Sequence, residues 1–167
     1  MIGTRSRRRW LNLAGVGIVI ALMSYALFAQ HVQGYEACPL CIFQRVALIG
    51  VGIVLLAAGL HSPRGARVYA VLGVAAAAVG SVVSGRHVYL QNLPPDQVPA
   101  CGPGLDYLRE AFPFSEMIRM VFTGSGECAE INWSFLGLSM PAWVLLWFVA
   151  LAGLAVVANW PRLGPPA

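Results

Sequence analysis

The chain has 167 residues, of which 58% are hydrophobic and 11% are charged, with a formal net charge of +4 and a mean hydropathy of +0.70. A soluble domain is about 25% charged, so this chain has too few charges to cover a water-facing surface. Lipid is the solvent expected for so much apolar area. The positive charge does not indicate a nucleic-acid partner, because the arginines lie beside apolar runs and form no single basic face.

Four apolar runs are each about as long as a membrane-spanning helix. They are predicted at residues 10–28, 41–60, 68–88 and 140–160 of a single membrane domain that takes in residues 1–167. The first run follows a basic segment, as a signal peptide would, but it is longer than the usual apolar core and lacks a small-residue cleavage pattern. We therefore expect an uncleaved first helix and an all-α integral membrane protein, built as a four-helix transmembrane bundle.

The arginines are distributed unequally between the two ends of these runs. Seven of them precede the first run, lie in the short connection at residues 61–67, or follow the fourth run: Arg5, Arg7, Arg8, Arg9, Arg64, Arg67 and Arg162. Arginine enrichment marks the cytoplasmic side, so both termini are predicted to be cytoplasmic. The segments at residues 29–40 and 91–139 then face outward. Within the second, residues 116–122 are apolar with spaced charges and too short to span, which predicts a short interfacial helix.

All four cysteines lie in the two outward segments or, for Cys41, at the outer end of the second span. Cys38 and Cys41 form a Cys-x-x-Cys motif, and Cys101 and Cys128 lie in the longer segment. An even number of cysteines facing an oxidising compartment indicates disulfides. The Cys-x-x-Cys spacing is typical of a readily exchanged disulfide. Zinc sites also use this spacing, but they need a second close pair of ligands, so no metal is predicted. Two inert structural disulfides remain the alternative.

Arg45 is the charged residue nearest to the Cys-x-x-Cys motif within a span. It follows Cys41 by four residues and so lies on the same helical face, one turn deeper. Snorkelling of the side chain to the interface is one reading, and a functional role is the other, because intramembrane charges are costly. A fixed cation there favours a thiolate at Cys41. It would also stabilise negative charge on a quinone oxygen.

These motifs resemble the DsbB family, the disulfide bond formation proteins of bacterial inner membranes. The resemblance rests on residues 38–45, on His87 with Leu90-Gln91, and on residues 124–130 with their continuation to Trp143. It covers all four spans and both outward segments, although residues 92–100 and 102–123 match by position alone. Many members have a glutamate before the arginine. Here Gln44 stands in that place, so an acid–arginine pair does not follow from the resemblance.

The resemblance implies that the chain re-oxidises a periplasmic thioredoxin-fold oxidase of the DsbA type. That partner, once reduced, would attack the disulfide of the longer segment. Cys101 would take the mixed disulfide, with Cys128 as its former partner. Electrons would then reach the Cys38–Cys41 pair through a transient Cys38–Cys128 link. A reductase that passes electrons outward is less favoured, because no cysteine lies in the interior of a span or in the inner connection.

The resemblance also implies a quinone, either ubiquinone or menaquinone, dissolved in the inner membrane. Cys41 would form a charge-transfer or covalent complex with it, and Arg45 would support both the quinone and the thiolate. His87 would lie near the quinone at the end of the third span. A helix-end histidine at the membrane interface is the alternative reading for His87. The sequence does not distinguish the two quinones, nor does it fix the oligomeric state.

Overall fold

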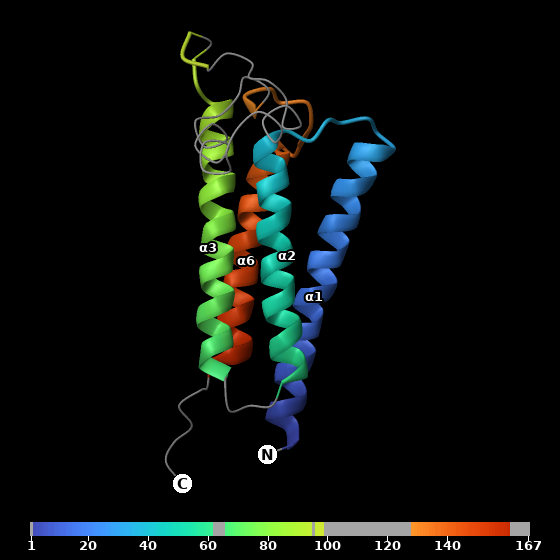
Figure 1. Cartoon of the computed structure of the whole chain (residues 1–167), viewed down its shortest axis with the longest axis vertical. Helices are drawn as coiled ribbons and strands as arrows, with labels where there is room; N and C mark the ends of the chain where they lie inside the picture. The colour runs from blue at the N-terminus through green and yellow to red at the C-terminus, as the bar shows by residue number, and fades with distance from the viewer. Residues whose placement is uncertain (1, 62–65, 95, 99–127, 161–167) are drawn as a thin grey trace, which may run out of the picture.

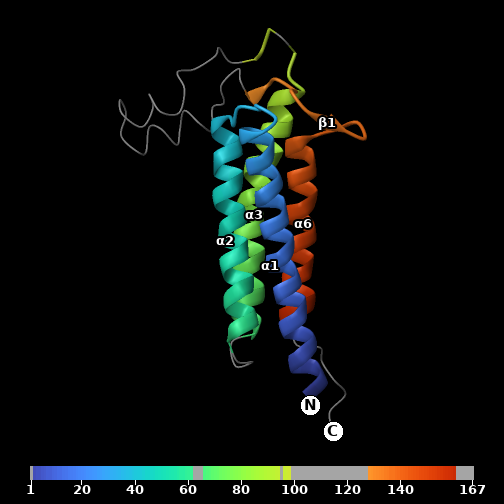
Figure 2. The same ribbon diagram turned by 90° about the vertical axis from the view of Figure 1, so that its right-hand side faces the viewer.

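The computed structural model describes residues 2–61, 66–94, 96–98 and 128–160. They form four long helices: α1 (Ile2–His31), α2 (Pro39–Leu60), α3 (Ala66–Gln91) and α6 (Met140–Asn159). Each is long and apolar enough to cross a membrane. The helices lie side by side as one bundle (Figures 1 and 2), which confirms the predicted fold class. We call the end where α1 ends and α2 begins the cysteine end, and the other the opposite end.

The connection between α1 and α2 is shorter than the outward segment expected at residues 29–40. α1 remains helical through His31, and α2 already begins at Pro39. Proline suits the first position of a helix, because its fixed φ is helical and its missing N–H is not needed there. Cys38 caps the same helix, since its Sγ accepts a hydrogen bond from the Cys41 amide at 3.3 Å. The residues of the Cys-x-x-Cys motif therefore also form the N-terminus of α2.

The core runs along the interface of α2, α3 and α6. Val51, Leu55, Ala77, Phe148 and Ala155 are all fully buried in one cluster. The outer helix faces carry exposed apolar side chains, among them Ile20, Val46, Ile53, Val71, Val79 and Val149. Such apolar faces are suited to contact with lipid rather than with water.

A glycine lets α6 pack closely against α3. A Cβ placed on Gly80 would overlap the ring of Phe148. Small residues at such positions allow helices in a membrane to approach each other closely, where van der Waals packing supplies much of the association energy.

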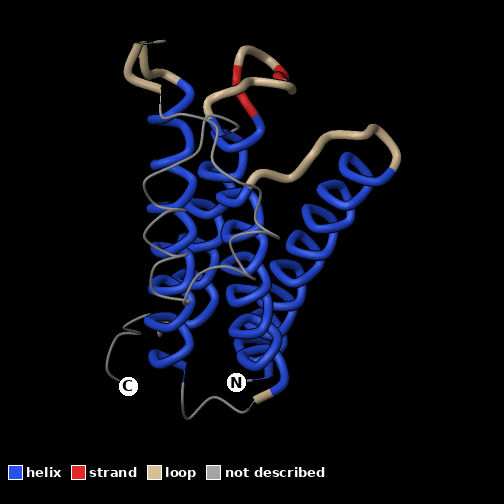
Figure 3. The backbone as a smooth tube through the Cα atoms, turned by 45° about the horizontal axis from the view of Figure 1, so that its top comes forward, coloured by secondary structure: helices blue, strands red, loops and turns tan. Residues whose placement is uncertain are grey.

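Polar side chains join α1 to α6 at the opposite end. Asn12 Nδ2 donates to Asn159 Oδ1 at 3.1 Å, and Asn159 Nδ2 donates back to Asn12 Oδ1 at 2.9 Å. Arg8 Nε also donates to Asn159 Oδ1, at 3.0 Å. Both asparagines are buried. α1 diverges from α2 toward the cysteine end (Figures 1 and 3), so this polar contact holds α1 where the bundle is closest.

A small β-hairpin precedes α6 and was not predicted. Its strands, β1 (Ser134–Phe135) and β2 (Leu138–Ser139), pair antiparallel. The two turn residues, Leu136 and Gly137, have φ values of 52° and 79°. Positive φ at both central positions is the requirement of a type I′ hairpin turn, and glycine meets it without strain. The interfacial helix predicted at residues 116–122 lies outside the described residues.

Candidate functional site

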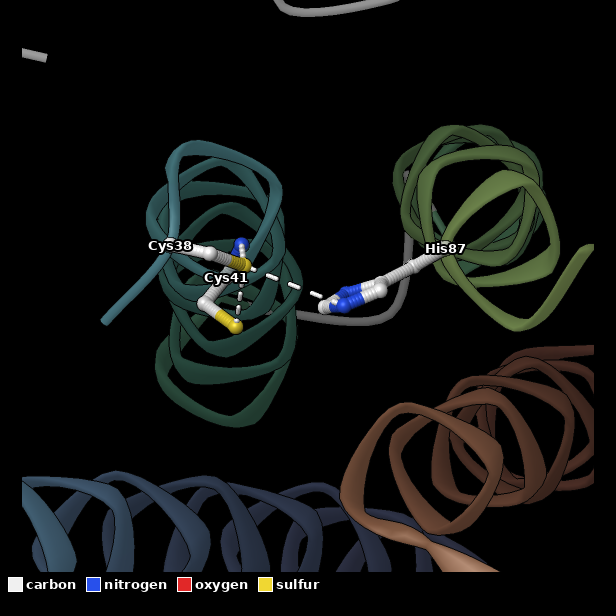
Figure 4. Close-up of side chains that lie close together, drawn as sticks. All are labelled: Cys38, Cys41 and His87. Carbon is white, nitrogen blue, oxygen red and sulfur yellow. Dashed lines mark hydrogen bonds between the residues drawn. The ribbon is translucent and has the colours of Figure 1, made fainter. Parts of the chain in front are cut away.

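The two cysteines of the Cys-x-x-Cys motif lie together at the cysteine end, on the first turn of α2. Cys38 Sγ is 2.9 Å from Cys41 Sγ, within hydrogen-bonding distance. Cys38 is buried and Cys41 is half-buried. The first helical turn brings side chains three residues apart to the same face, which is why this spacing suits an exchangeable pair. Figure 4 shows both sulfur atoms on the side of α2 that faces the bundle interior.

Cys128 is brought to the same place from the far end of the long segment. It is 1% exposed and packs in one apolar cluster with Cys38, Leu40, Val83 and Leu90. Hydrogen bonding with the Cys128 thiol, then with Cys41, and burial raise the pKa of the Cys38 thiol. Cys38 therefore stands between Cys128 on one side and Cys41 on the other. Cys101, the fourth predicted site residue, lies outside the described residues.

His87 reaches the pair from α3. Its Nε2 lies 3.8 Å from Cys38 Sγ, and its Nδ1 lies 3.0 Å from the Gln44 side-chain nitrogen. Both His87 and Gln44 are buried. In this arrangement the amide donates to Nδ1, so the ring proton sits on Nε2 and faces the sulfur. His87 is thus buried beside the cysteine pair, near the end of α3.

Arg45 turns from α2 toward α1. Its guanidinium donates to the Gln30 side-chain oxygen and to the Ala26 carbonyl oxygen at 3.1 Å. Both acceptors are uncharged, and the side chain is half-buried. The positive charge is therefore held in place by hydrogen bonds to two uncharged groups on α1.

An apolar cavity of about 280 Å³ lies beside Cys41. Cys41, Gln44 and Arg45 line it from α2, while α1, the α1–α2 connection with Glu36, the hairpin segment and α6 form the other walls. Six aromatic side chains also line it: Tyr25, Tyr35, Trp133, Phe135, Trp143 and Trp147. Apolar and aromatic walls with a few convergent polar groups are typical of small-molecule sites. His87 is not among the lining residues. Its ring nevertheless lies within 4.8 Å of both sulfur atoms of the motif.

Sequence reasoning identified the cysteines, Arg45 and His87, but it missed several partners. Gln44 was noted only as a departure from a family pattern, although its position three residues after Cys41 puts it on the same helical face. Gln30 gave no signal, because a polar residue at the end of an apolar run is expected anyway. The aromatic residues of the hairpin had no predictable place, since nothing local indicates that β1 folds over the end of α1. Tyr25 and Trp133 do meet there, with ring centroids 6.1 Å apart.

Comparison with known proteins finds one family model that matches nearly the whole described bundle. The model of disulfide bond formation protein DsbB matches residues 8–158. The chain is 47% identical over 154 residues to disulfide bond formation protein B of Nitrosococcus oceani, covering 91% of this chain and 89% of that one. It is 49% identical over 146 residues to the protein of the same name from Hahella chejuensis, covering 86% and 88%. The corresponding protein of Acinetobacter baumannii is 54% identical over 132 residues, covering 77% of each chain. The chain belongs to the DsbB family of disulfide bond formation proteins.

Proposed function

We propose that this protein is a quinone-dependent thiol oxidase that re-oxidises a periplasmic dithiol oxidase of the DsbA type. The names of its relatives place disulfide bond formation in those proteins. The observation that carries the finer proposal is the position of the Cys-x-x-Cys pair. Cys38 contacts Cys128, and Cys41 lines the apolar cavity. One cysteine pair thus connects the long outward segment with a site suited to an apolar electron acceptor.

The first half of the reaction is thiol–disulfide exchange. A thiolate of the reduced partner attacks Cys101 of a Cys101–Cys128 disulfide and forms a mixed disulfide, releasing the Cys128 thiolate. The second partner thiolate then releases the oxidised partner, so that two electrons reside on the protein's own thiols. The contact between Cys38 and Cys128 supports transfer to the second pair through a Cys38–Cys128 link. Attack of Cys128 on Cys38 displaces Cys41 as the leaving thiolate.

The cavity beside Cys41 fits the head of a quinone. Its walls are mainly apolar and aromatic, and its polar groups come from α2, from Gln30 on α1 and from Glu36 in the α1–α2 connection. A bound quinone supplies the oxidising equivalent, taking up two electrons and two protons. The protein's own residues do the rest. Cys41 presents its sulfur to the cavity, and Arg45 holds a positive charge one turn deeper, where it stabilises a Cys41 thiolate.

Arg45 is suited to this task because α1 fixes its position. The two hydrogen bonds to Gln30 and Ala26 hold the guanidinium at the cavity wall. A charge positioned beforehand stabilises developing negative charge without reorganising during the reaction. This role requires the cysteine end to face the periplasm, with both termini in the cytoplasm, as the arginine distribution predicts.

A direct assay tests the proposal. Purified protein in detergent is mixed with a reduced DsbA-type partner and a soluble ubiquinone, and quinone absorbance is followed. We expect quinone loss that requires the partner and disappears in Cys41→Ser. The matched control is His61→Ala, at the opposite end of α2, which should retain the parent rate. Quinone loss that is independent of the partner, or full activity in Cys41→Ser, would overturn the proposal.

A further inference from the structure

Three potential metal-binding side chains converge at the cysteine end. The ligand atoms of Cys38, Cys41 and His87 all lie within 4.8 Å of one another. Figure 4 shows the two sulfur atoms on α2 and the imidazole on α3 directed toward a common space. Sequence reasoning predicted no metal because it saw no second ligand pair near the motif. The fold supplies the missing ligand from a residue 46 positions after Cys41.

We propose that, when its Cys38–Cys41 pair is reduced, this protein binds one zinc or cadmium ion through the two thiolates and His87. Two sulfurs and one imidazole nitrogen are a ligand set that zinc uses in sites with an open fourth position. Thiolates are soft ligands, so the site favours zinc-group ions over magnesium or calcium. Solvent fills the fourth position. This inference goes beyond the proposed oxidase activity and does not depend on it.

The geometry needs only small adjustments. In a tetrahedral zinc site with ordinary bond lengths, two sulfurs are about 3.8 Å apart and sulfur and nitrogen are about 3.6 Å apart. The observed separations are 2.9 Å between the sulfurs and 3.8 Å between Cys38 Sγ and His87 Nε2. Rotation of one cysteine side chain widens the first distance, since Cys41 is half-buried beside the cavity.

Gln44 allows His87 to act as a ligand. A ligating imidazole nitrogen carries no proton, so Nε2 must lose its proton and Nδ1 must gain one. An amide can accept from Nδ1–H as well as donate to Nδ1, because rotation exchanges its oxygen and its nitrogen. Gln44, 3.0 Å from Nδ1, therefore supports both tautomers of His87. Partners of this kind orient metal-bound histidines and raise their affinity.

The charge and proton balance also suits a buried site. The two thiols release two protons to solvent as they become thiolates, and no electron is transferred. The two negative charges of the thiolates neutralise the doubly charged ion. A neutral complex avoids the cost of burying a net charge. The disulfide form lacks both thiolates, so the ion binds only the reduced pair. A bound ion therefore opposes oxidation of Cys38 and Cys41.

A cadmium titration tests the site. The protein is the full chain with Cys101→Ser and Cys128→Ser, kept reduced by a phosphine, so that the only thiols are Cys38 and Cys41. The readout is the ultraviolet charge-transfer absorption of cadmium thiolates. We expect saturation at one ion per chain, and an affinity at least about tenfold lower in His87→Gln. The control His61→Ala removes an exposed histidine from the opposite end and should bind as the parent does.

A second variant separates ligand loss from misfolding. His87→Cys restores a ligand and should recover the affinity while adding the absorption of a third thiolate. No saturable absorption, or equal affinity with and without His87, overturns the site. The outcome is distinguishable from failure of the oxidase proposal, because the titration contains neither quinone nor partner. If the protein binds cadmium but the quinone assay shows no activity, only the oxidase proposal fails. If the quinone assay shows activity but no cadmium binds, only the metal site fails.

Discussion

Gln44 and His87 face each other between α2 and α3, with 3.0 Å from the amide nitrogen to Nδ1. Both side chains are buried, so this hydrogen bond is not exchanged with water. It determines which ring nitrogen carries the proton and thereby what the imidazole presents to Cys38. A buried polar pair of this kind fixes side-chain orientation as well as contributing to stability.

Substitutions at Gln44 should change the tautomer of His87. In the parent protein, without metal, we expect the proton on Nε2. Gln44→Glu should move it to Nδ1, because a carboxylate only accepts hydrogen bonds. Gln44→Leu should leave a mixture and destabilise the protein by about 1–3 kcal/mol. Nitrogen-15 spectra of histidine-labelled protein distinguish the tautomers, with His61 as an internal control. Identical His87 spectra in all three proteins would show that Gln44 has no influence on the ring.

Gly80→Ala should destabilise the bundle, because the added methyl overlaps the Phe148 ring. Overpacking of this kind costs about 1–3 kcal/mol. The free energy of unfolding in mixed micelles measures the loss. Gly85→Ala, on the same helix, is the matched control: a Cβ there has no neighbour within 4 Å. That variant should be neutral or slightly more stable, since alanine favours helix over glycine.

The steric explanation can be tested further by shortening the ring partner. Gly80→Ala combined with Phe148→Leu should cost less than the sum of the two single changes, because the smaller side chain leaves room for the methyl. Additive losses would mean that Gly80 serves some purpose other than accommodating Phe148.

The Asn12–Asn159 pair should show a favourable coupling energy in a double-mutant cycle. Replacing either asparagine with alanine leaves the other amide without its partner, and a coupling of about 0.6–1.7 kcal/mol is expected for an interhelical hydrogen bond in lipid. Unfolding free energies of the four proteins of the cycle give the value. Asn92→Ala is the control, since the exposed Asn92 side chain, just after α3, donates to the Val88 carbonyl of that helix and not to a neighbouring helix among the described residues. A coupling near zero would remove the pair as a link between α1 and α6.

Arg45→Met should lower kcat/KM for quinone by at least about tenfold, which corresponds to about 1.4 kcal/mol of transition-state stabilisation. The reason is loss of the fixed charge beside Cys41. Gln30→Met is the matched variant, because it removes a hydrogen-bond acceptor on α1 while the cation remains. Its effect should be smaller, about threefold or less, in steady-state kinetics with a soluble quinone. Equal losses in the two variants would assign the role of Arg45 to anchoring α1 and not to its charge.

Cys128→Ala should increase the reactivity of Cys38 in the reduced protein. Cys128 is the largest cause of the raised pKa at Cys38. A raised pKa means less thiolate at a given pH, and the thiolate is the form that alkylates. Below the pKa, each unit by which it falls increases the rate about tenfold. Alkylation at pH about 8, with Cys38 followed by mass spectrometry, measures the change. Cys128→Ser retains a hydrogen-bonding side chain and should give a smaller increase.

The sequence was sufficient to predict the four helices and the location of three of the functional groups. Long apolar runs specify helices because lipid leaves no other way to satisfy the backbone. Cys38, Cys41 and Arg45 are local neighbours on α2, so their mutual placement follows from helical spacing alone. The predicted ends of the first and second spans were less accurate at the cysteine end. His31 and Pro39 are helical there, although neither residue type is typical of a span interior.

The remaining parts of the site depend on contacts between helices. That His87 lies near a quinone stays a prediction from the resemblance. The structure adds that its ring lies against Cys38 and is held by Gln44. The contact of Cys128 with Cys38 links residues 90 positions apart, which no periodic pattern can predict. The anchoring of Arg45 by Gln30 likewise depends on how α1 is rotated. Each of these contacts depends on how the helices pack against one another, which cannot be predicted from the spacing of residues in the sequence.

The hydrogen bonds made by α1 have a consequence for how that helix can move. Asn12 and Gln30 are 18 residues apart, which is about five complete helical turns, so they lie on one line along the helix. One contacts α6 at the opposite end and the other contacts Arg45 at the cysteine end. Rotation of α1 about its own axis breaks both contacts at once, and apolar lipid offers no replacement partners. Tilting about Asn12 breaks only the contact at Arg45. Both contacts therefore oppose rotation of α1 about its axis, whereas only the contact at Arg45 opposes a change in its tilt, and that tilt sets how far α1 lies from α2 beside Cys41.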